Sequence, residues 1–115
     1  MLFALLASAA LTAPNLTTVQ KSAIKAAVED KLKDPDSAQY KWRPWNGSET
    51  YCGSVNAKNS YGGYIGFTPF LALLDNRKGI AKPMVFIMLA SADPQSVELK
   101  VIIDQCAKAG YTYGP

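Results

Sequence analysis

The fold is decided by residues 62–90, which read GGYIGFTPFLALLDNRKGIAKPMVFIMLA. The polar, glycine-containing run 75–79 divides this stretch, so we predict two antiparallel strands, over residues 62–74 and 80–90, joined by a turn. The apolar run 84–89 has no interruption, which predicts a strand buried on both faces. Pro69 and Pro83 are expected at bulges or strand ends rather than at central ladder positions.

A hairpin is predicted just upstream, over residues 38–57. Between residues 37 and 43, Tyr40 and Trp42 alternate with polar side chains, which is the period of a strand. Pro44 interrupts the pattern and is typical of an edge strand. Asn46-Gly47 is a turn signal, and residues 49–56 resume as the second strand.

A helix is predicted on each side of these strands. The first covers residues 17–33, with a capping box at Thr17 and an end imposed by Asp34-Pro35. Residues 94–109 have helix signals at both ends, with Asp93 as the cap and Gly110 as the stop. Residues 97–101 also alternate like a strand, but the two caps favour a helix that carries Cys106 on its inward face.

Together these elements predict one α+β domain over residues 14–115. The order is N-terminal helix, about four antiparallel strands, C-terminal helix, with the helices on one face of the sheet. The sequence shows no repeat, low-complexity tract or linker that would indicate a second domain.

The composition excludes several classes of function. The chain has 115 residues, 12 Lys plus Arg, 9 Asp plus Glu and no histidine. Without histidine, the usual general base, the common nucleophile systems and the commonest metal ligand are missing, so we expect no catalytic residues, cofactor or metal site. The formal net charge of +3 is mild, and acidic residues interrupt the basic ones along the first helix, so we expect no nucleic-acid partner.

Residues 1–13 are predicted to be a signal peptide. The apolar start is shorter than the roughly 20 residues of a membrane span, and it ends in small residues that favour cleavage near Ala9 to Ala13, best after Ala9 or Ala10. The alternative is an N-terminal helix of the fold. Export would make the protein periplasmic or secreted, leave no transmembrane span after processing and pair Cys52 with Cys106, whereas a cytosolic protein would keep two buried thiols.

One segment has unusual chemistry. Residues 51–70 read YCGSVNAKNSYGGYIGFTPF, with an aromatic at every third position from Tyr61 to Phe70 and glycines between them. On a strand this spacing would send Tyr61 and Phe67 to one face and the other two aromatics to the opposite face. The candidate binding residues are Asn56, Lys58, Asn59, Ser60, Tyr61 and Tyr64.

Three interpretations of that segment stay open. In the first, exposed tyrosine rings and amide groups bind a glycan or a protein. In the second, the glycines and polar side chains only shape the turn. In the third, Lys58 is a base or nucleophile beside Asp34, Asp36 or Glu49, although the spacing does not distinguish this from ordinary surface charge.

Three features stand together in this sequence: residues 34–38, DPDSA, residues 52–64, CGSVNAKNSYGGY, and the late Cys106. In these features the sequence resembles a group of small exported or lipoprotein-like proteins of Gram-negative bacteria and their phages. The resemblance implies export and the disulfide, but no particular activity. The lipid-attachment cysteine of some such proteins is absent here, so no lipid anchor is expected.

These observations predict an exported, non-enzymatic binding domain that recognises an envelope protein or a cell-wall glycan through residues 56–64. The alternative is a structural envelope protein without a dedicated site.

Overall fold

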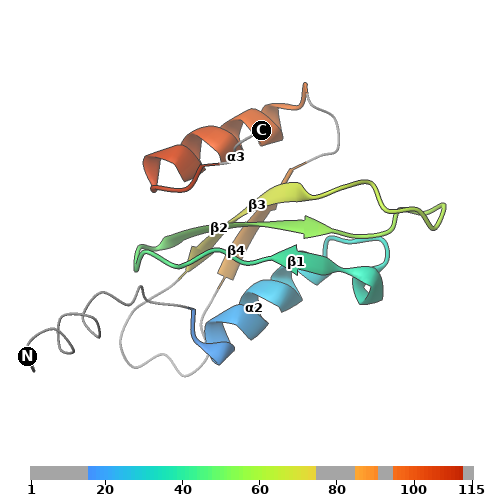
Figure 1. Cartoon of the computed structure of the whole chain (residues 1–115), viewed down its shortest axis with the longest axis horizontal. Coiled ribbons are helices and arrows are strands. Elements are labelled where there is room, and N and C mark those ends of the chain that lie inside the picture. Colours follow the sequence, from blue (N-terminus) through green and yellow to red (C-terminus); the bar gives the residue numbers. More distant parts are fainter. Residues whose placement is uncertain (1–15, 75–84, 91–94, 113–115) are drawn as a thin grey trace, which may run out of the picture.

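The computed structural model describes residues 16–74, 85–90 and 95–112 and shows an α+β fold (Figure 1). Its elements are α2 (Thr18–Glu29), the short 3-10 helix η1 (Pro35–Ser37), β1 (Gln39–Lys41), β2 (Thr50–Asn56), β3 (Thr68–Leu74), β4 (Val85–Leu89) and α3 (Val97–Lys108). The expected signal peptide, the turn at residues 75–79, Pro83 and Asp93 lie outside the described residues.

The four strands form one antiparallel sheet in the order β1-β2-β3-β4. The hairpin between β1 and β2 is confirmed, but its connection is longer than the Asn46-Gly47 turn alone, because pairing begins only at Lys41 with Ser54. Pro69 is the second residue of β3, and its carbonyl accepts from the Ala90 amide at 3.0 Å. Its position near a strand end agrees with the prediction.

The helices lie on opposite faces of the sheet, so the expectation that they share one face is wrong (Figure 1). Cys52 pairs with Leu71 on β3, and a disulfide joins Cys52 to Cys106 on α3, so α3 covers that face. Tyr40 pairs with Val55, whose side chain points the other way from Cys52. The Tyr40 hydroxyl donates to a Glu29 carboxylate oxygen at 2.7 Å, which places α2 on this second face.

The physical reason is that β2 and the middle of β3 are buried on both sides. Tyr51 and Cys52 are neighbours that point in opposite directions, yet both are fully buried. A sheet with two apolar faces needs a cover on each, and one helix supplies each cover. From α2 the buried residues are Ile24 and Val28, and from α3 they are Ile102 and Cys106.

β4 is less buried than its apolar sequence predicts. Ile87 is buried on the α2 face, but Phe86 is 64% exposed on the other. Because β4 ends the strand order and α3 lies over β2, β3 and β4 together, the expectation of burial on both faces is wrong at Phe86.

Two predicted helix ends also shift. α2 has the predicted capping box at Thr17, but it ends at Glu29 rather than at residue 33. Just after this end, the Lys31 amide donates to the Val28 carbonyl and the Leu32 amide donates to the Glu29 carbonyl, which forms a turn. The C-terminal segment is a helix, as the caps favoured. Its N-cap is Ser96, which accepts from the Leu99 amide, so the predicted start at Pro94 is wrong.

Gly53 lets the ring of Phe70 on β3 pack closely against the backbone of β2. A Cβ atom at this position would lie 2.8 Å from Cζ of the buried Phe70 ring and 3.2 Å from the Lys41 carbonyl oxygen. The Phe70 ring therefore occupies the space that a side chain on β2 would fill, and it reaches Trp42 with ring centroids 6.3 Å apart.

Candidate functional site

Five of the six candidate residues lie on the β2–β3 loop (residues 57–67), which projects beyond the end of the sheet, and Asn56 is the last residue of β2 (Figure 1). Lys58 and Tyr64 form an isolated bridge that extends the pairing of the two strands. Beyond it the chain reverses, with the Asn59 amide donating to the Gly63 carbonyl at 2.9 Å and the Gly62 amide to the Asn59 carbonyl at 3.0 Å. Gly62 takes a φ of +83°, a conformation that favours glycine.

Two asparagine side chains hold this loop in shape. Oδ1 of Asn59 accepts from the amides of Tyr61 at 2.9 Å and Gly63 at 3.2 Å. Oδ1 of Asn56 accepts from the Gly66 amide at 3.1 Å. The Oδ1 atom of each asparagine therefore accepts hydrogen bonds from backbone amides of the loop. This agrees with the interpretation that the polar side chains of the segment shape the turn.

Tyr61 is the most exposed large hydrophobic residue among the described residues, at 96%. It lies at the tip of the loop beside Ser60, which is also exposed. A tyrosine ring that contacts water on nearly all sides is held by its backbone alone. The structure thus presents this ring outward from a turn that internal hydrogen bonds fix.

Lys58 and Tyr64 form the base of the same loop. The Lys58 ammonium lies 5.7 Å from the centre of the Tyr64 ring, within the range of a cation–π contact. The Tyr64 hydroxyl donates to the Ser37 carbonyl at 3.0 Å. Lys58 has no ion pair with Asp34, Asp36 or Glu49 in the described chain, so nothing there favours the enzymatic interpretation.

Ser37 joins residues 34–38 to the base of the β2–β3 loop. Its hydroxyl accepts from the Lys58 amide at 2.8 Å and donates to the Asp34 carbonyl at 2.7 Å. Residues 34–38, which directly precede β1, therefore support the base of the β2–β3 loop. Ser37 was not among the residues predicted for the site, since its contact with Lys58 joins positions 21 residues apart and leaves no local signal in the sequence.

The expected division of the aromatic residues between two sheet faces is wrong. β3 begins at Thr68, because Gly62 and Gly66 have positive φ values and break the strand that was predicted from residue 62. Phe70 is fully buried in the core. Phe67 is partly exposed before the strand and lies under the Lys41 ammonium, 4.2 Å from its ring centre.

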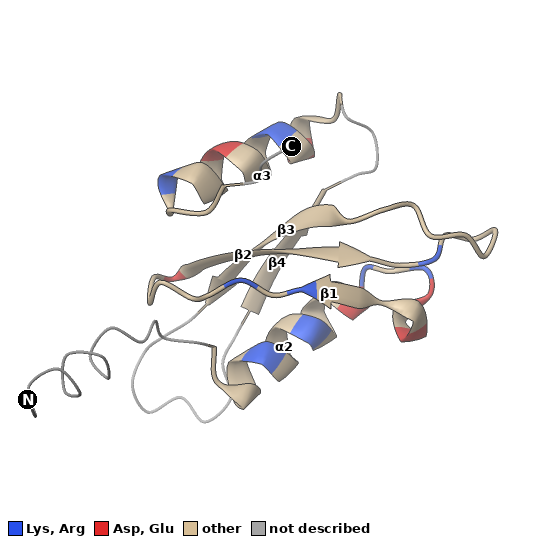
Figure 2. Ribbon diagram, viewed as in Figure 1, with Lys and Arg blue, Asp and Glu red and all other residues tan. Residues whose placement is uncertain are grey.

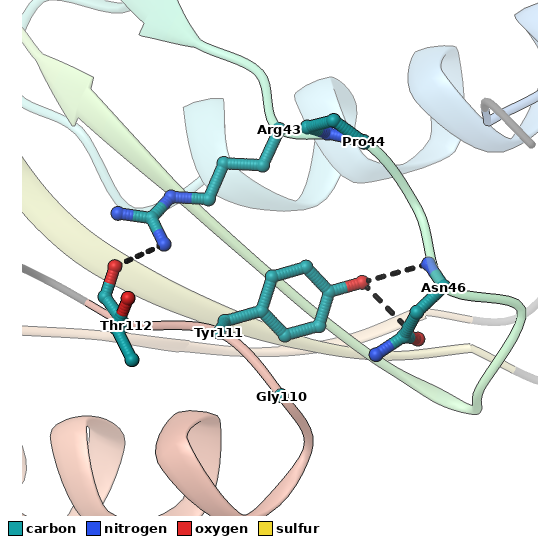
Figure 3. Close-up of a pocket in the computed structure, with 6 residues that line it drawn as sticks. All are labelled: Arg43, Pro44, Asn46, Gly110, Tyr111 and Thr112. Carbon is teal, nitrogen blue, oxygen red and sulfur yellow. Dashed lines mark hydrogen bonds between the residues drawn. The ribbon is translucent and has the colours of Figure 1, made fainter. Parts of the chain in front are cut away.

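A hollow lies at the other end of β2, around the chain that follows α3 (Figure 3). Arg43 donates to the Thr112 carbonyl, and the Tyr111 hydroxyl contacts the Asn46 amide at 3.3 Å and its side-chain oxygen at 3.4 Å. Asn46 Nδ2 also donates to the Ala109 carbonyl at 2.5 Å. These contacts attach the end of α3 to the β1–β2 connection, so we regard this hollow as structural.

The shifted tyrosine pKa values also belong to the packing. Burial, followed by the hydrogen bond to Glu29, raises the pKa of Tyr40 far above its usual range. Burial also raises the pKa of Tyr51 and of Tyr111, although hydrogen bonds from the backbone oppose it. These three rings carry their hydroxyls as neutral groups and stabilise the fold in that form.

Residues 16–74, 85–90 and 95–112 contain no group of three or more Cys, Asp or Glu residues placed to hold a metal ion. In the same ranges, no helix is both long enough and apolar enough to cross a membrane. No protein-family model, curated protein or solved structure compared with the chain matches it.

Proposed function

We propose that the protein is an exported, non-enzymatic binding domain that recognises an envelope protein or a cell-wall glycan through residues 56–64. The observation that carries the proposal is the 96% exposed Tyr61 ring on a loop with a fixed backbone. Tyrosine offers a flat apolar face and a polar tip, which suits both sugars and protein hot spots. A loop already ordered before binding loses less conformational entropy when a partner arrives.

The neighbouring residues have distinct roles in this proposal. Lys58 supplies a positive charge, and Tyr64 supplies a second, partly exposed ring beside it. Asn56 and Asn59 shape the loop with their oxygens, while their Nδ2 groups donate no hydrogen bond within the described chain. Those donors remain for a ligand. The periplasmic or secreted location is supported by the Cys52–Cys106 disulfide, because disulfides persist in oxidising compartments.

The test is capture of a partner by variants that leave the loop backbone intact. Tyr61→Ser with Lys58→Gln removes the exposed ring and the charge but no hydrogen bond that shapes the turn. We expect this pair to lose capture from a Gram-negative envelope fraction and from purified cell-wall sacculi. The melting temperature should move by no more than about 4 °C, as for other surface changes.

Phe86→Ser is the matched control, because it removes a 64% exposed aromatic ring from β4. The proposal is contradicted if the variant with both the Tyr61 and the Lys58 changes captures a partner as well as the wild type does. It is also contradicted if Phe86→Ser loses capture to the same extent.

The second candidate is a structural envelope protein with no dedicated site. The internal bonds of Asn56, Asn59 and Ser37 favour it, since they account for much of the polar character of the segment. It predicts that the Tyr61 and Lys58 changes alter no binding at all.

A further inference from the structure

A pocket of about 170 Å³ lies beside the β2–β3 loop, between the base of that loop and the turn that follows α2. Its apolar walls include Leu32, Val55, Ala57, Ile65 and Leu89. A cavity of about 150 Å³ is enough to hold a ring the size of benzene. This pocket therefore has room for one apolar side chain of a partner.

Three lysines line the same pocket. Lys31 and Lys33 belong to the turn after α2, and Lys58 belongs to the loop. No aspartate or glutamate is among the described residues that line it, and within the described ranges none of the three ammonium groups has an ion pair. Figure 2 shows basic positions of the turn after α2 and of the loop at the same end of the molecule, with acidic positions of the chain after α2 beside them. The pocket thus joins an apolar interior to a rim that carries three ammonium groups, while Asp30 and Asp34, the acidic neighbours of Lys31 and Lys33 in the sequence, do not line it.

We propose that this pocket binds an acidic peptide segment of the partner protein. One apolar side chain of the peptide enters the pocket, and flanking carboxylates meet the three lysines. The apolar interior favours a protein over a glycan, because sugars offer no aliphatic or aromatic side chain to fill it. Charge complementarity at the rim sets the association rate and selects acidic segments. This inference rests on the proposed function and assigns its partner to the class of proteins.

The first experiment is an amide-resolved NMR titration of the folded, oxidised protein. The probe is the blocked peptide acetyl-Glu-Glu-Leu-Glu-Glu-amide at concentrations up to about 10 mM, since a single small pocket with exposed charges binds at the millimolar level. We expect saturable shifts at the amides of Leu32, Ala57 and Ile65. Binding should weaken as salt rises, because the lysines of the rim are screened.

Two further peptides separate the contribution of the carboxylates from that of the apolar side chain. Replacing the four glutamates with glutamine should weaken binding about fivefold or more, and replacing the leucine with serine should weaken it similarly. No saturable shift with the acidic peptide, or equal binding of the glutamine peptide, overturns the proposal.

Lysine variants locate the site on the protein. Lys31→Gln combined with Lys33→Gln should weaken binding of the acidic peptide about fivefold. Lys100→Gln with Lys108→Gln removes the same charge from α3, on the other face of the sheet, and should have no effect. An equal loss in both pairs would show nonspecific charge attraction and overturn the proposal. So would binding of anionic phospholipid vesicles through Lys31 and Lys33 without binding of the peptide.

The envelope assay distinguishes this inference from the proposed function. Capture that requires Tyr61 but not Lys31 and Lys33 refutes the pocket and leaves the proposed function intact. Peptide binding through Lys31 and Lys33, with no capture that depends on Tyr61, refutes the proposed role of the loop tip and leaves the pocket intact.

Discussion

The disulfide should contribute a large part of the stability of this domain. Cys52 and Cys106 are both fully buried, and their bond closes a loop across a sequence separation of 54. Replacing both with alanine removes this link between β2 and α3 and deletes only a sulfur atom from each site. The expected loss therefore comes mainly from the unfolded state, which gains the freedom that the bond had removed.

The magnitude follows from the separation of 54 residues. The loop-entropy relation gives about 14 cal/mol/K for such a loop, which is about 4 kcal/mol at 25 °C. Single domains have total stabilities of about 5–15 kcal/mol, so this loss would be between a quarter and most of the total. The melting temperature should fall by roughly 15–20 °C for a domain of this length.

The assay is urea unfolding followed by the fluorescence of Trp42 and Trp45, comparing the wild type with Cys52→Ala/Cys106→Ala. Wild-type protein kept reduced should unfold at nearly the same urea concentration as the variant. Ile102→Val is a control on the same buried face of α3 and should cost only about 0.5–1.5 kcal/mol. A loss below about 1 kcal/mol on removing the disulfide would refute the reasoning, because the bond would then constrain little in the unfolded chain.

The other predictions concern the core, the loop and one tyrosine. Gly53→Ala should destabilise the protein by about 1–3 kcal/mol in urea, because its Cβ would overlap the Phe70 ring, and a neutral result would contradict the close approach. Asn59→Ala should cost about 1 kcal/mol and Ser60→Ala under about 0.5 kcal/mol, since only Asn59 accepts amide bonds in the turn; equal costs would refute that role. The pKa of Tyr40 is raised in the folded state, so its contribution is complete below the unfolded value near 10 and is lost as pH rises above it. Unfolding free energy should therefore fall more steeply above about pH 10 in the wild type than in Tyr40→Phe, and parallel curves would contradict this.

Local signals in the sequence predicted the elements well. The Thr17 capping box, the Asn46-Gly47 turn and the Gly110 stop all occur, with Gly47 and Gly110 at positive φ. Each of these signals acts over a few residues, and tertiary packing left them unchanged. The disulfide between Cys52 and Cys106, which the sequence predicted for an exported chain against the alternative of two buried thiols, is present.

The errors came from features that depend on distant residues. Periodicity within one strand shows that a face is apolar but not which helix covers it, so the opposite placement of α2 and α3 was missed. The aromatic run was mistaken for a strand because the sequence alone does not reveal that Gly62 and Gly66 have positive φ values. The contact between Ser37 and Lys58 joins positions 21 residues apart, and no local rule predicts it.

The central claim is that the tip of the β2–β3 loop contacts a partner in the cell envelope. The most direct measurement is crosslinking of envelope fractions with a photoreactive group placed at residue 61, compared with the same group at residue 86. Our account predicts a specific crosslink from position 61 that excess unlabelled wild-type protein abolishes, and none of the same mass from position 86. No crosslink at position 61, or the same product from both positions, would contradict it.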